Sequence, residues 1–363
     1  MEPYDGAVSA VDWLDSLSPW PHEFGLERMH ALLAELGIPQ DAYPAVHVVG
    51  TNGKSTATVT IEQLLLSEGL SVGATISPHL ESWSERIRLN GAAADFEEVV
   101  GRVRPAAERV GATQFETVTA AALAVFAEAE VDVAVVEAGL GGRLDATNVL
   151  ATRVVLLTNV GLEHTDVLGD TVEEIAREKL AVAREGSIIV LPDRTYAHLV
   201  DGHEVRIGGA RDAAEAFVGH PIAAEIAVEL PGRFERRGSE IRDGAHNPHG
   251  VRYLLDRLRG SEPQGIALSD FTVVAAILAD KDADEMLREL RRAGPRLVAT
   301  ASSSSRSLPA TEVAELARPY FDHVEAIDDP TDALARAHEL GEPVLVTGSL
   351  YLLGDLAQAE RRA

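Results

Sequence analysis

The feature that most constrains the fold is a glycine-rich segment that joins an apolar strand to a helix. Ala45–Gly50 reads AVHVVG, an apolar run of strand length that ends in glycine. Residues 50–56 read GTNGKST, and Thr56–Glu68 has the composition of a helix that ends near Gly69. A strand, a glycine-rich turn and a helix in this order are the context of a phosphate-binding loop. We therefore expect an α/β domain that binds a phosphorylated ligand.

The side chains of this loop suit phosphate chemistry. Its glycines let the backbone wrap around phosphates, and the start of the helix offers N–H groups and the positive end of its dipole. Lys54 supplies a point charge for the β- and γ-phosphates, and Thr56 or Ser55 supplies a hydroxyl for Mg²⁺. The loop is shorter than the GxxxxGK(S/T) form, since Gly50 precedes Gly53 by three residues. The alternative is a plain strand-to-helix turn that binds nothing.

Strand-like and helix-like segments alternate along the chain. The strands expected after the loop are Ser71–Ile76, Val131–Glu137, Arg153–Asn159 and Ser187–Leu191, and the expected helices are Asp95–Arg109, Thr117–Glu130 and Thr171–Arg184. Thr171 and Glu174 form a capping box at the start of the last helix. This alternation predicts parallel βαβ units with helices on both faces of a sheet. Pro192–Val228 has no regular pattern.

A second, smaller α/β domain is predicted after the junction sequence LPG at Leu230–Gly232. Its expected helices are Asn247–Arg259, Asp282–Arg292 and one at the end of the chain, and its expected strands are Phe271–Leu278, Arg296–Thr300 and Val344–Thr347. We therefore expect two domains, residues 1–230 and 231–363.

The amino-acid composition argues against several classes of function. The net charge of −26 repels phosphate backbones and argues against nucleic acid as a partner. The absence of cysteine excludes a disulfide framework, a thiolate metal site and a cysteine nucleophile. No apolar run reaches the ~18–20 residues of a membrane span, and Met1–Asp15 lacks the pattern of a signal peptide. We expect a cytoplasmic protein without membrane contact.

Lysine is scarce in this chain. Only Lys54, Lys179 and Lys281 occur, and the other 29 of the 32 basic residues are arginine. An acid-rich, lysine-poor surface suits a salt-rich cytoplasm that screens charge repulsion, so we expect a salt-adapted (halophilic) source. The three remaining lysines are then expected where arginine would not serve.

Further candidate residues follow predicted strands, where α/β sheets bind their ligands. Ser77 begins SPHL, which alone would indicate only a turn. Glu137 ends an apolar strand, and a carboxylate beside a phosphate loop is placed like a Walker-B acid that holds Mg²⁺. His164 is able to ligate a metal, although a lone histidine is more often structural. Asp243 and His246 lie near the domain junction, where clefts form, but capping and turn chemistry would also explain them.

Together these segments resemble the folylpolyglutamate synthase/dihydrofolate synthase branch of the Mur ligase superfamily. They occur in the family's order over nearly the whole chain. The matching segments are FGLER (24–28), HVVGTNGK (47–54), SPHL (77–80), ERIRLNG (85–91), VEAGLGGRLDATN (136–148), EHTDVLG (163–169), AREK (176–179), LPGRFE (230–235), DGAHNPHG (243–250), ILADKD (277–282) and TGSLYL (347–352). The resemblance implies a phosphate-loop-containing, Mur-ligase-like central domain and a smaller Rossmann-like C-terminal domain.

The resemblance also implies residue roles. The ATP phosphates would be bound by Gly50, Thr51, Asn52, Gly53, Lys54, Ser55, Thr56 and Arg233. Magnesium would be held by Ser77, Glu137 and His164, assisted by Lys179, which matches a lysine that is carbamylated in the family. The pterin substrate would contact Phe115 and Asp145, and Asp243 and His246 would complete the ATP and amino-acid site. The loop departs from the family in having Ser55-Thr56 where Gly-Ser is usual.

The implied activity is ATP-dependent ligation of L-glutamate to dihydropteroate or folates through an acyl phosphate, with a monomer as the expected state. The choice between first glutamylation and chain extension stays open, and we favour a bifunctional enzyme. One rival is a peptidoglycan-type Mur ligase, which would need an N-terminal domain before Gly50. A second rival is a non-catalytic nucleotide-binding protein on the same fold.

Overall fold

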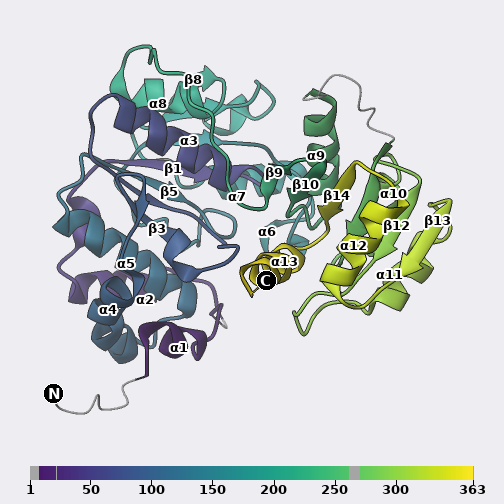
Figure 1. The fold of residues 1–363 in the computed structure, drawn as a ribbon. Coiled ribbons are helices and arrows are strands. Elements are labelled where there is room, and N and C mark those ends of the chain that lie inside the picture. The colour runs from purple at the N-terminus through teal and green to yellow at the C-terminus, as the bar shows by residue number, and fades with distance from the viewer. Residues whose placement is uncertain (1–7, 22, 261–269, 363) are drawn as a thin grey trace. The chain divides into compact units, whose positions relative to one another are not determined.

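The computed structural model describes residues 8–21, 23–260 and 270–362, so part of the predicted N-terminal segment Met1–Asp15 lies outside the described residues. Its contacts divide the chain into two compact units, Met1–Val228 and Glu229–Ala363. Each unit contains one sheet flanked by helices, as Figure 1 shows.

The first unit contains an eight-stranded sheet in the order β4-β3-β2-β5-β1-β6-β7-β8. Its strands are β1 (Ala45–Val49), β2 (Val72–Thr75), β3 (Ile87–Leu89), β4 (Ala92–Ala93), β5 (Val133–Glu137), β6 (Thr152–Leu157), β7 (Ile188–Leu191) and β8 (Glu204–Ile207). Strands β2, β5, β1, β6, β7 and β8 run parallel, while β3 and β4 form an antiparallel edge. All five residues of β1 are buried, as expected for a central parallel strand covered on both faces.

Helices cover both faces of this sheet, which confirms the α/β fold expected from the sequence (Figure 1). The helices of this unit are α1 (Ala10–Asp15), α2 (Glu27–Glu35), α3 (Lys54–Ser67), α4 (Phe96–Val110), α5 (Gln114–Glu128), α6 (Thr165–Leu168), α7 (Val172–Leu180) and α8 (Ala210–Val218). Val46 and Val48 of β1 pack in the cluster formed with α3 and α8, whereas Ala45 packs in the cluster formed with α1, α2, α4 and α5. This division follows from the alternation of side chains along a strand.

The second unit contains a six-stranded sheet in the order β13-β12-β11-β14-β10-β9. Its strands are β9 (Arg233–Arg237), β10 (Glu240–Asp243), β11 (Thr272–Ala275), β12 (Arg296–Ala299), β13 (His323–Ala326) and β14 (Val344–Thr347). Its helices are α9 (Pro248–Gly260), α10 (Ala283–Leu290), α11 (Ala310–Ala317), α12 (Pro330–Leu340) and α13 (Leu350–Arg362). Only β9 pairs antiparallel within this described sheet.

Several elements differ from the sequence-based expectation. Residues 192–228 were expected to be irregular, but they contain β8 and α8. Helix α5 begins at Gln114 rather than near Thr117, because Thr113 and Glu116 form a capping box there. Strands β9 and β10 were missed because they contain paired charges, such as Arg242 with Glu240, in place of an apolar run.

Two other features agree with the sequence. The predicted capping box of Thr171 and Glu174 is present at the start of α7. Within the described ranges, no helix is both long and apolar enough to cross a lipid bilayer.

Candidate active site

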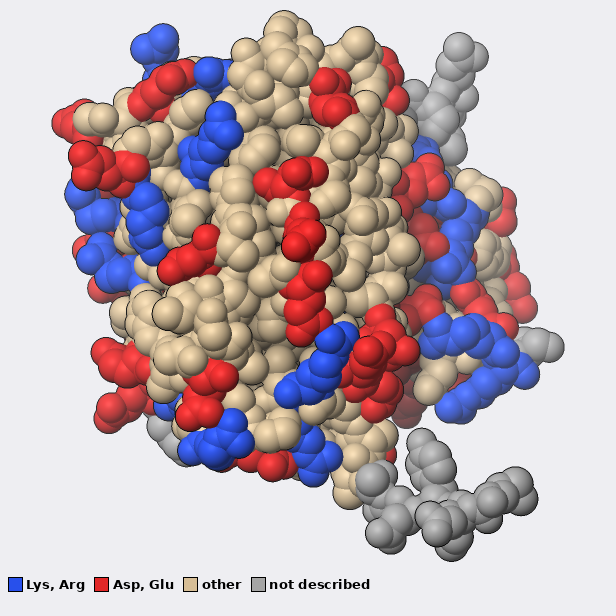
Figure 2. Space-filling view, turned by 90° about the vertical axis from the view of Figure 1, so that its left-hand side faces the viewer, with Lys and Arg blue, Asp and Glu red and all other residues tan. Residues whose placement is uncertain are grey.

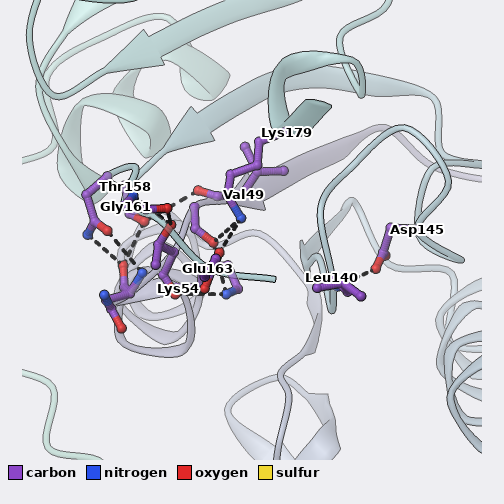
Figure 3. Close-up of polar contacts among 12 residues, drawn as sticks. Val49, Lys54, Leu140, Asp145, Thr158, Gly161, Glu163 and Lys179 are labelled. Atoms are coloured by element: carbon purple, nitrogen blue, oxygen red, sulfur yellow. Dashed lines mark hydrogen bonds and ion pairs between the residues drawn. The ribbon is translucent and has the colours of Figure 1, made fainter. Parts of the chain in front are cut away.

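Two lysine ammonium groups meet at one backbone carbonyl after β1. Lys54 Nζ and Lys179 Nζ each donate a hydrogen bond of 3.0 Å to the carbonyl oxygen of Gly50 (Figure 3). Lys54 Nζ also lies 3.3 Å from the carbonyl oxygen of Thr51. Lys179 Nζ donates to Glu163 Oε1 at 2.7 Å. The structure therefore joins the phosphate loop to α7 through a cluster of two cations and one carboxylate.

Glycine is required at Gly50 and favoured at Gly53 by the path of the loop. Gly50 has a φ of +147°, and a Cβ atom there would lie 1.9 Å from Thr158 Oγ1. Gly53 is the N-cap of α3 and has a φ of 78°, a left-handed conformation that costs other residues energy. A side chain at Gly50 would therefore force the loop away from the segment that follows β6.

The loop is fixed by the residues that follow β6 (Figure 3). Asn159 Oδ1 accepts from the Asn52 N–H at 3.0 Å, and Asn159 Nδ2 donates to the Asn52 carbonyl at 2.8 Å. Thr158 Oγ1 donates to the same carbonyl at 2.8 Å. Thr51 Oγ1 accepts from the Gly161 N–H at 3.0 Å. These bonds hold the loop against the segment that follows β6.

Burial shifts the pKa values of Lys179 and Glu163 in this cluster. Lys179 is 1% exposed, and burial lowers its pKa, an effect that the carboxylate of Glu163 partly offsets. For Glu163, burial acts to raise the pKa, but Lys179 and Lys54 outweigh it and the pKa is lowered overall. The buried lysine therefore depends on Glu163 to stay charged.

Glu137 connects the loop to two neighbouring segments at the end of β5. Its side chain is buried, Ser55 Oγ lies 3.2 Å from its Oε1, and the Ser77 N–H donates to its Oε2 at 3.0 Å. The sequence left open whether Ser55 or Thr56 offers its hydroxyl to Mg²⁺, and in the structure it is Ser55 that lies beside the carboxylate of Glu137. Thr56 is half-buried in the first turn of α3.

The donor chemistry at this position fits magnesium. Mg²⁺ prefers oxygen ligands and usually keeps several waters, binding one or two carboxylates together with phosphates. Ser55 and Glu137 bring a hydroxyl and a carboxylate together, and the main chain of Ser77 contacts the same carboxylate. His164, the third predicted ligand, is exposed and is the N-cap of α6. In the described part of the chain, no group of three His, Cys, Asp or Glu side chains is arranged to hold a metal.

The predicted pterin contacts lie on α5 and on the loop after β5. Phe115 packs so closely on Gly139 that a Cβ atom there would lie 2.5 Å from its ring. Asp145 accepts from the N–H of Leu140 at 2.7 Å and from the N–H of Thr147 at 3.0 Å (Figure 3 shows the first). Thr147 Oγ1 also donates to Asp145. Burial raises the pKa of Asp145, although these hydrogen bonds oppose the rise. Its carboxylate therefore fixes the shape of the loop.

A buried histidine extends this network towards the phosphate loop. His47 of β1 is fully buried, and its Nε2 lies 2.8 Å from Thr147 Oγ1. Because the Thr147 hydroxyl donates its proton to Asp145, His47 must donate from Nε2. Burial and the nearby Arg184 lower the pKa of His47 to about 3. The neutral ring therefore links β1 to the loop that contains Asp145.

The predicted residues of the second unit lie together at the end of β10. Asp243 pairs with Arg233 across the β9–β10 ladder. Burial raises the pKa of Asp243, while Arg233 and Arg257 act to lower it. His246 Nδ1 lies 2.8 Å from the Gly244 carbonyl, which can only accept, so the proton of a neutral His246 ring is on Nδ1. These contacts bring together Arg233, Asp243 and His246.

Sequence reasoning gave no role to Glu163 or His47. Glu163 lies in the motif EHTDVLG beside His164, which drew attention to the histidine. The signal that would have found Glu163 is the need of a buried lysine for a counter-charge. His47 was treated as one residue of a buried strand, and its partner Thr147 is distant in sequence.

A prediction follows for the buried histidine. The folded pKa of His47 is about 3, below the ordinary value of 6.5, so its contribution to stability is present above pH 6.5 and is lost as the pH falls towards 3. Between pH 7 and pH 5, His47→Gln should therefore lose about 2 kcal/mol less unfolding free energy than the wild type. Urea unfolding at both pH values measures this difference.

The control for this experiment is His30→Gln, at an exposed histidine of α2. It should retain the pH dependence of the wild type. An equal pH dependence in the wild type and His47→Gln would show that the ring of His47 is protonated in the folded protein.

Comparisons with known proteins all point to one enzyme family. Residues 48–204 match the Mur ligase middle domain, and residues 232–350 match the Mur ligase, glutamate ligase domain. The chain is 30% identical to the dihydrofolate synthase/folylpolyglutamate synthase of Escherichia coli (strain K12), over 97% of this chain and 94% of that protein.

Solved structures agree with these matches. E. coli FolC in complex with DHPP and ADP has a TM-score of 0.85 and 26% identity, covering 99% of this chain and 100% of that chain. A bifunctional folylpolyglutamate synthase/dihydrofolate synthase with Mn, AMPPNP and L-glutamate bound has a TM-score of 0.83 and 29% identity, covering 98% of each chain. The chain therefore belongs to the dihydrofolate synthase/folylpolyglutamate synthase family of the Mur ligases.

Proposed function

We propose that this protein is an ATP-dependent ligase that joins L-glutamate to dihydropteroate and to folates through an acyl-phosphate intermediate. The observation that carries the proposal is the convergence of Lys54 and Lys179 on the Gly50 carbonyl of a phosphate loop. This cluster lies in a chain that matches the family over nearly its whole length. A non-catalytic nucleotide-binding protein would have no use for a second, buried lysine at its phosphate loop.

The chemistry begins with the poor reactivity of a carboxylate. Transfer of the γ-phosphoryl group of ATP converts it to an acyl phosphate, which the amine of glutamate attacks to give an amide, ADP and phosphate. The N–H groups at the start of α3 and the ammonium of Lys54 stabilise the negative charge of the phosphates. Ser77, Glu137 and His164 are the residues that would hold Mg²⁺, whose charge further offsets that of the phosphates.

The family resemblance assigns further polar groups to the second unit. Arg233 provides a cation for phosphate, and it lies opposite Asp243 in the β9–β10 ladder. His246 or Asp243 orients the incoming amine in this proposal, and neither is assigned as the general base. A relative with L-glutamate bound supports the choice of amino acid.

Lys179 is proposed to act as a carbamate. Carbon dioxide reacts with a neutral amine, and burial of Lys179 lowers its pKa and so favours the neutral form. The resulting anion would repel Glu163 unless a divalent cation bound nearby, so carbamylation and Mg²⁺ binding should favour each other. Arginine cannot replace this lysine because a guanidinium does not form a carbamate.

We also propose that both glutamylation steps are performed, since Phe115 and Asp145 match the family's contacts to the pterin. We further propose that the protein is a cytoplasmic monomer and that its source is a salt-adapted organism. On the face shown in Figure 2, several acidic side chains lie in a row with no basic side chain between them. Such a surface suits a solvent that screens repulsion.

Phosphate release should depend on both the pterin substrate and glutamate. With Mg-ATP, L-glutamate and either dihydropteroate or tetrahydrofolate, the wild type should release phosphate, and without a pterin it should not. Lys54→Ala should lower kcat by about 10²–10³-fold, because charge developing at the phosphates loses its cation. If the folded protein released phosphate at the same rate with and without a pterin, the acid substrate would have to be a different compound.

The carbamate of Lys179 predicts a requirement for carbon dioxide. Wild-type turnover should fall in degassed, bicarbonate-free buffer and return when bicarbonate is added. Lys179→Arg retains the positive charge of the unmodified ammonium but forms no carbamate, so it should lose about 10²-fold in kcat and not respond to bicarbonate. Wild-type activity in Lys179→Arg would contradict the proposal.

The charge of the protein predicts stabilisation by salt. Repulsion within a chain of net charge −26 is screened over about 3 Å in 1 M salt and about 10 Å in 0.1 M salt. The melting temperature should therefore rise between 0.1 M and 2 M KCl, and NaCl of equal ionic strength should act similarly. A melting temperature that stays constant in both salts would contradict salt adaptation.

A further inference from the structure

Trp20 is a large aromatic residue for which the motifs give no role. It lies between α1 and α2, and 48% of it is exposed. Single exposed hydrophobic residues are common and need no explanation by themselves. Trp20 differs from such residues because it lies beside Phe115.

Trp20 lies next to Phe115, the residue that we propose to contact the pterin. The centroids of the two rings are 5.9 Å apart, and the ring planes make an angle of 39°. Phe115 in turn packs on Gly139 of the loop that contains Asp145. Trp20 therefore extends an aromatic surface that begins at this loop.

Hydrogen bonds to α5 hold the segment of Trp20 in place. The N–H of Gln114, the first residue of α5, donates to the Ser18 carbonyl at 2.9 Å. Gln114 Nε2 donates to the Leu14 carbonyl at 3.2 Å. Ser18 Oγ donates to the Trp20 carbonyl at 2.7 Å. Because Gln114 precedes Phe115 directly, these bonds fix the main chain of Trp20 relative to the phenyl ring.

We propose that Trp20 is a specificity-determining residue that covers the flat, bicyclic end of the acid substrate beside Phe115. An exposed indole offers a face on which a planar heteroaromatic ring stacks, and such stacking is insensitive to the substituents at the far end of the ligand. The two ring planes are tilted by 39°, and about half of Trp20 stays exposed beside Phe115. This inference rests on the proposed function, because it assumes a pterin at Phe115.

The test compares Trp20→Ala, Trp20→Phe and the wild type in the phosphate-release assay. Trp20→Ala should raise the KM for dihydropteroate and for tetrahydrofolate about tenfold, since both contain the same bicyclic ring. Its kcat and its KM for ATP and for glutamate should stay within about twofold, because stacking acts on the pterin alone. Trp20→Phe retains an aromatic face and should restore most of the affinity.

Tyr253→Ala is the matched control, because Tyr253 is an exposed aromatic residue on α9 of the second unit. It should behave as the wild type for all substrates. Dihydropteroate should also quench the tryptophan fluorescence of the wild type more than that of Trp20→Phe, which retains Trp13 and Trp83.

Each result has a defined meaning. An unchanged pterin KM in Trp20→Ala, with pterin-dependent release by the wild type, overturns the role of Trp20 and leaves the proposed function intact. An equal rise of the KM for ATP also overturns it, because a general distortion would then explain the loss. No pterin-dependent release by the wild type overturns the proposed function itself.

Discussion

The carbonyl oxygen of Gly50 is the point on which the proposed active site depends. It accepts hydrogen bonds from two ammonium groups, Lys54 from the first turn of α3 and Lys179 from α7. Two cations at one neutral oxygen repel each other, and Glu163 offsets that repulsion. Removal of the carboxylate would leave the buried Lys179 without its counter-charge, and breaking a buried ion pair in this way typically costs about 3–5 kcal/mol. The cluster therefore ties together three segments that are far apart in sequence.

The order and direction of the strands bring the residues of this cluster together. Strand β1 lies between β5 and β6 and runs parallel to both, so all three strands end at the same edge of the sheet. Glu137 ends β5, Gly50 follows β1, and Thr158 to Glu163 follow β6. A one-residue shift of β1 would turn His47 and Val48 to the opposite faces and break the bond from His47 to Thr147. The register of one strand thus sets both the phosphate loop and the loop of Asp145.

The sequence predicted the parts of the molecule that contain strong local signals. The central strands are apolar runs, and Thr171 and Glu174 form a capping box at the start of α7, so these strands and the start of this helix were predicted closely, although α7 ends at Leu180 rather than at Arg184. Strands β9 and β10 and residues 192–228 were not, since charged pairs and short segments leave no periodic pattern. In the site, the loop and Glu137 follow from spacing alone. The pairing of Glu163 with Lys179 does not follow from sequence spacing, because it depends on the orientation of α7 relative to β1.

The scarcity of lysine bears on the same cluster. In a chain with 29 arginines, Lys54 and Lys179 share one carbonyl oxygen, and an ammonium is a compact charge on a flexible stem. A guanidinium is a planar fork with five donors, and two of them would neither fit around one oxygen nor satisfy their remaining N–H groups in a buried space. Lys281 of the second unit pairs with Asp280 at 3.0 Å, and Arg306 shares the same carboxylate, so arginine is tolerated in that contact. Geometry therefore explains why Lys54 and Lys179 are lysines, whereas no contact among the described residues explains a lysine at position 281.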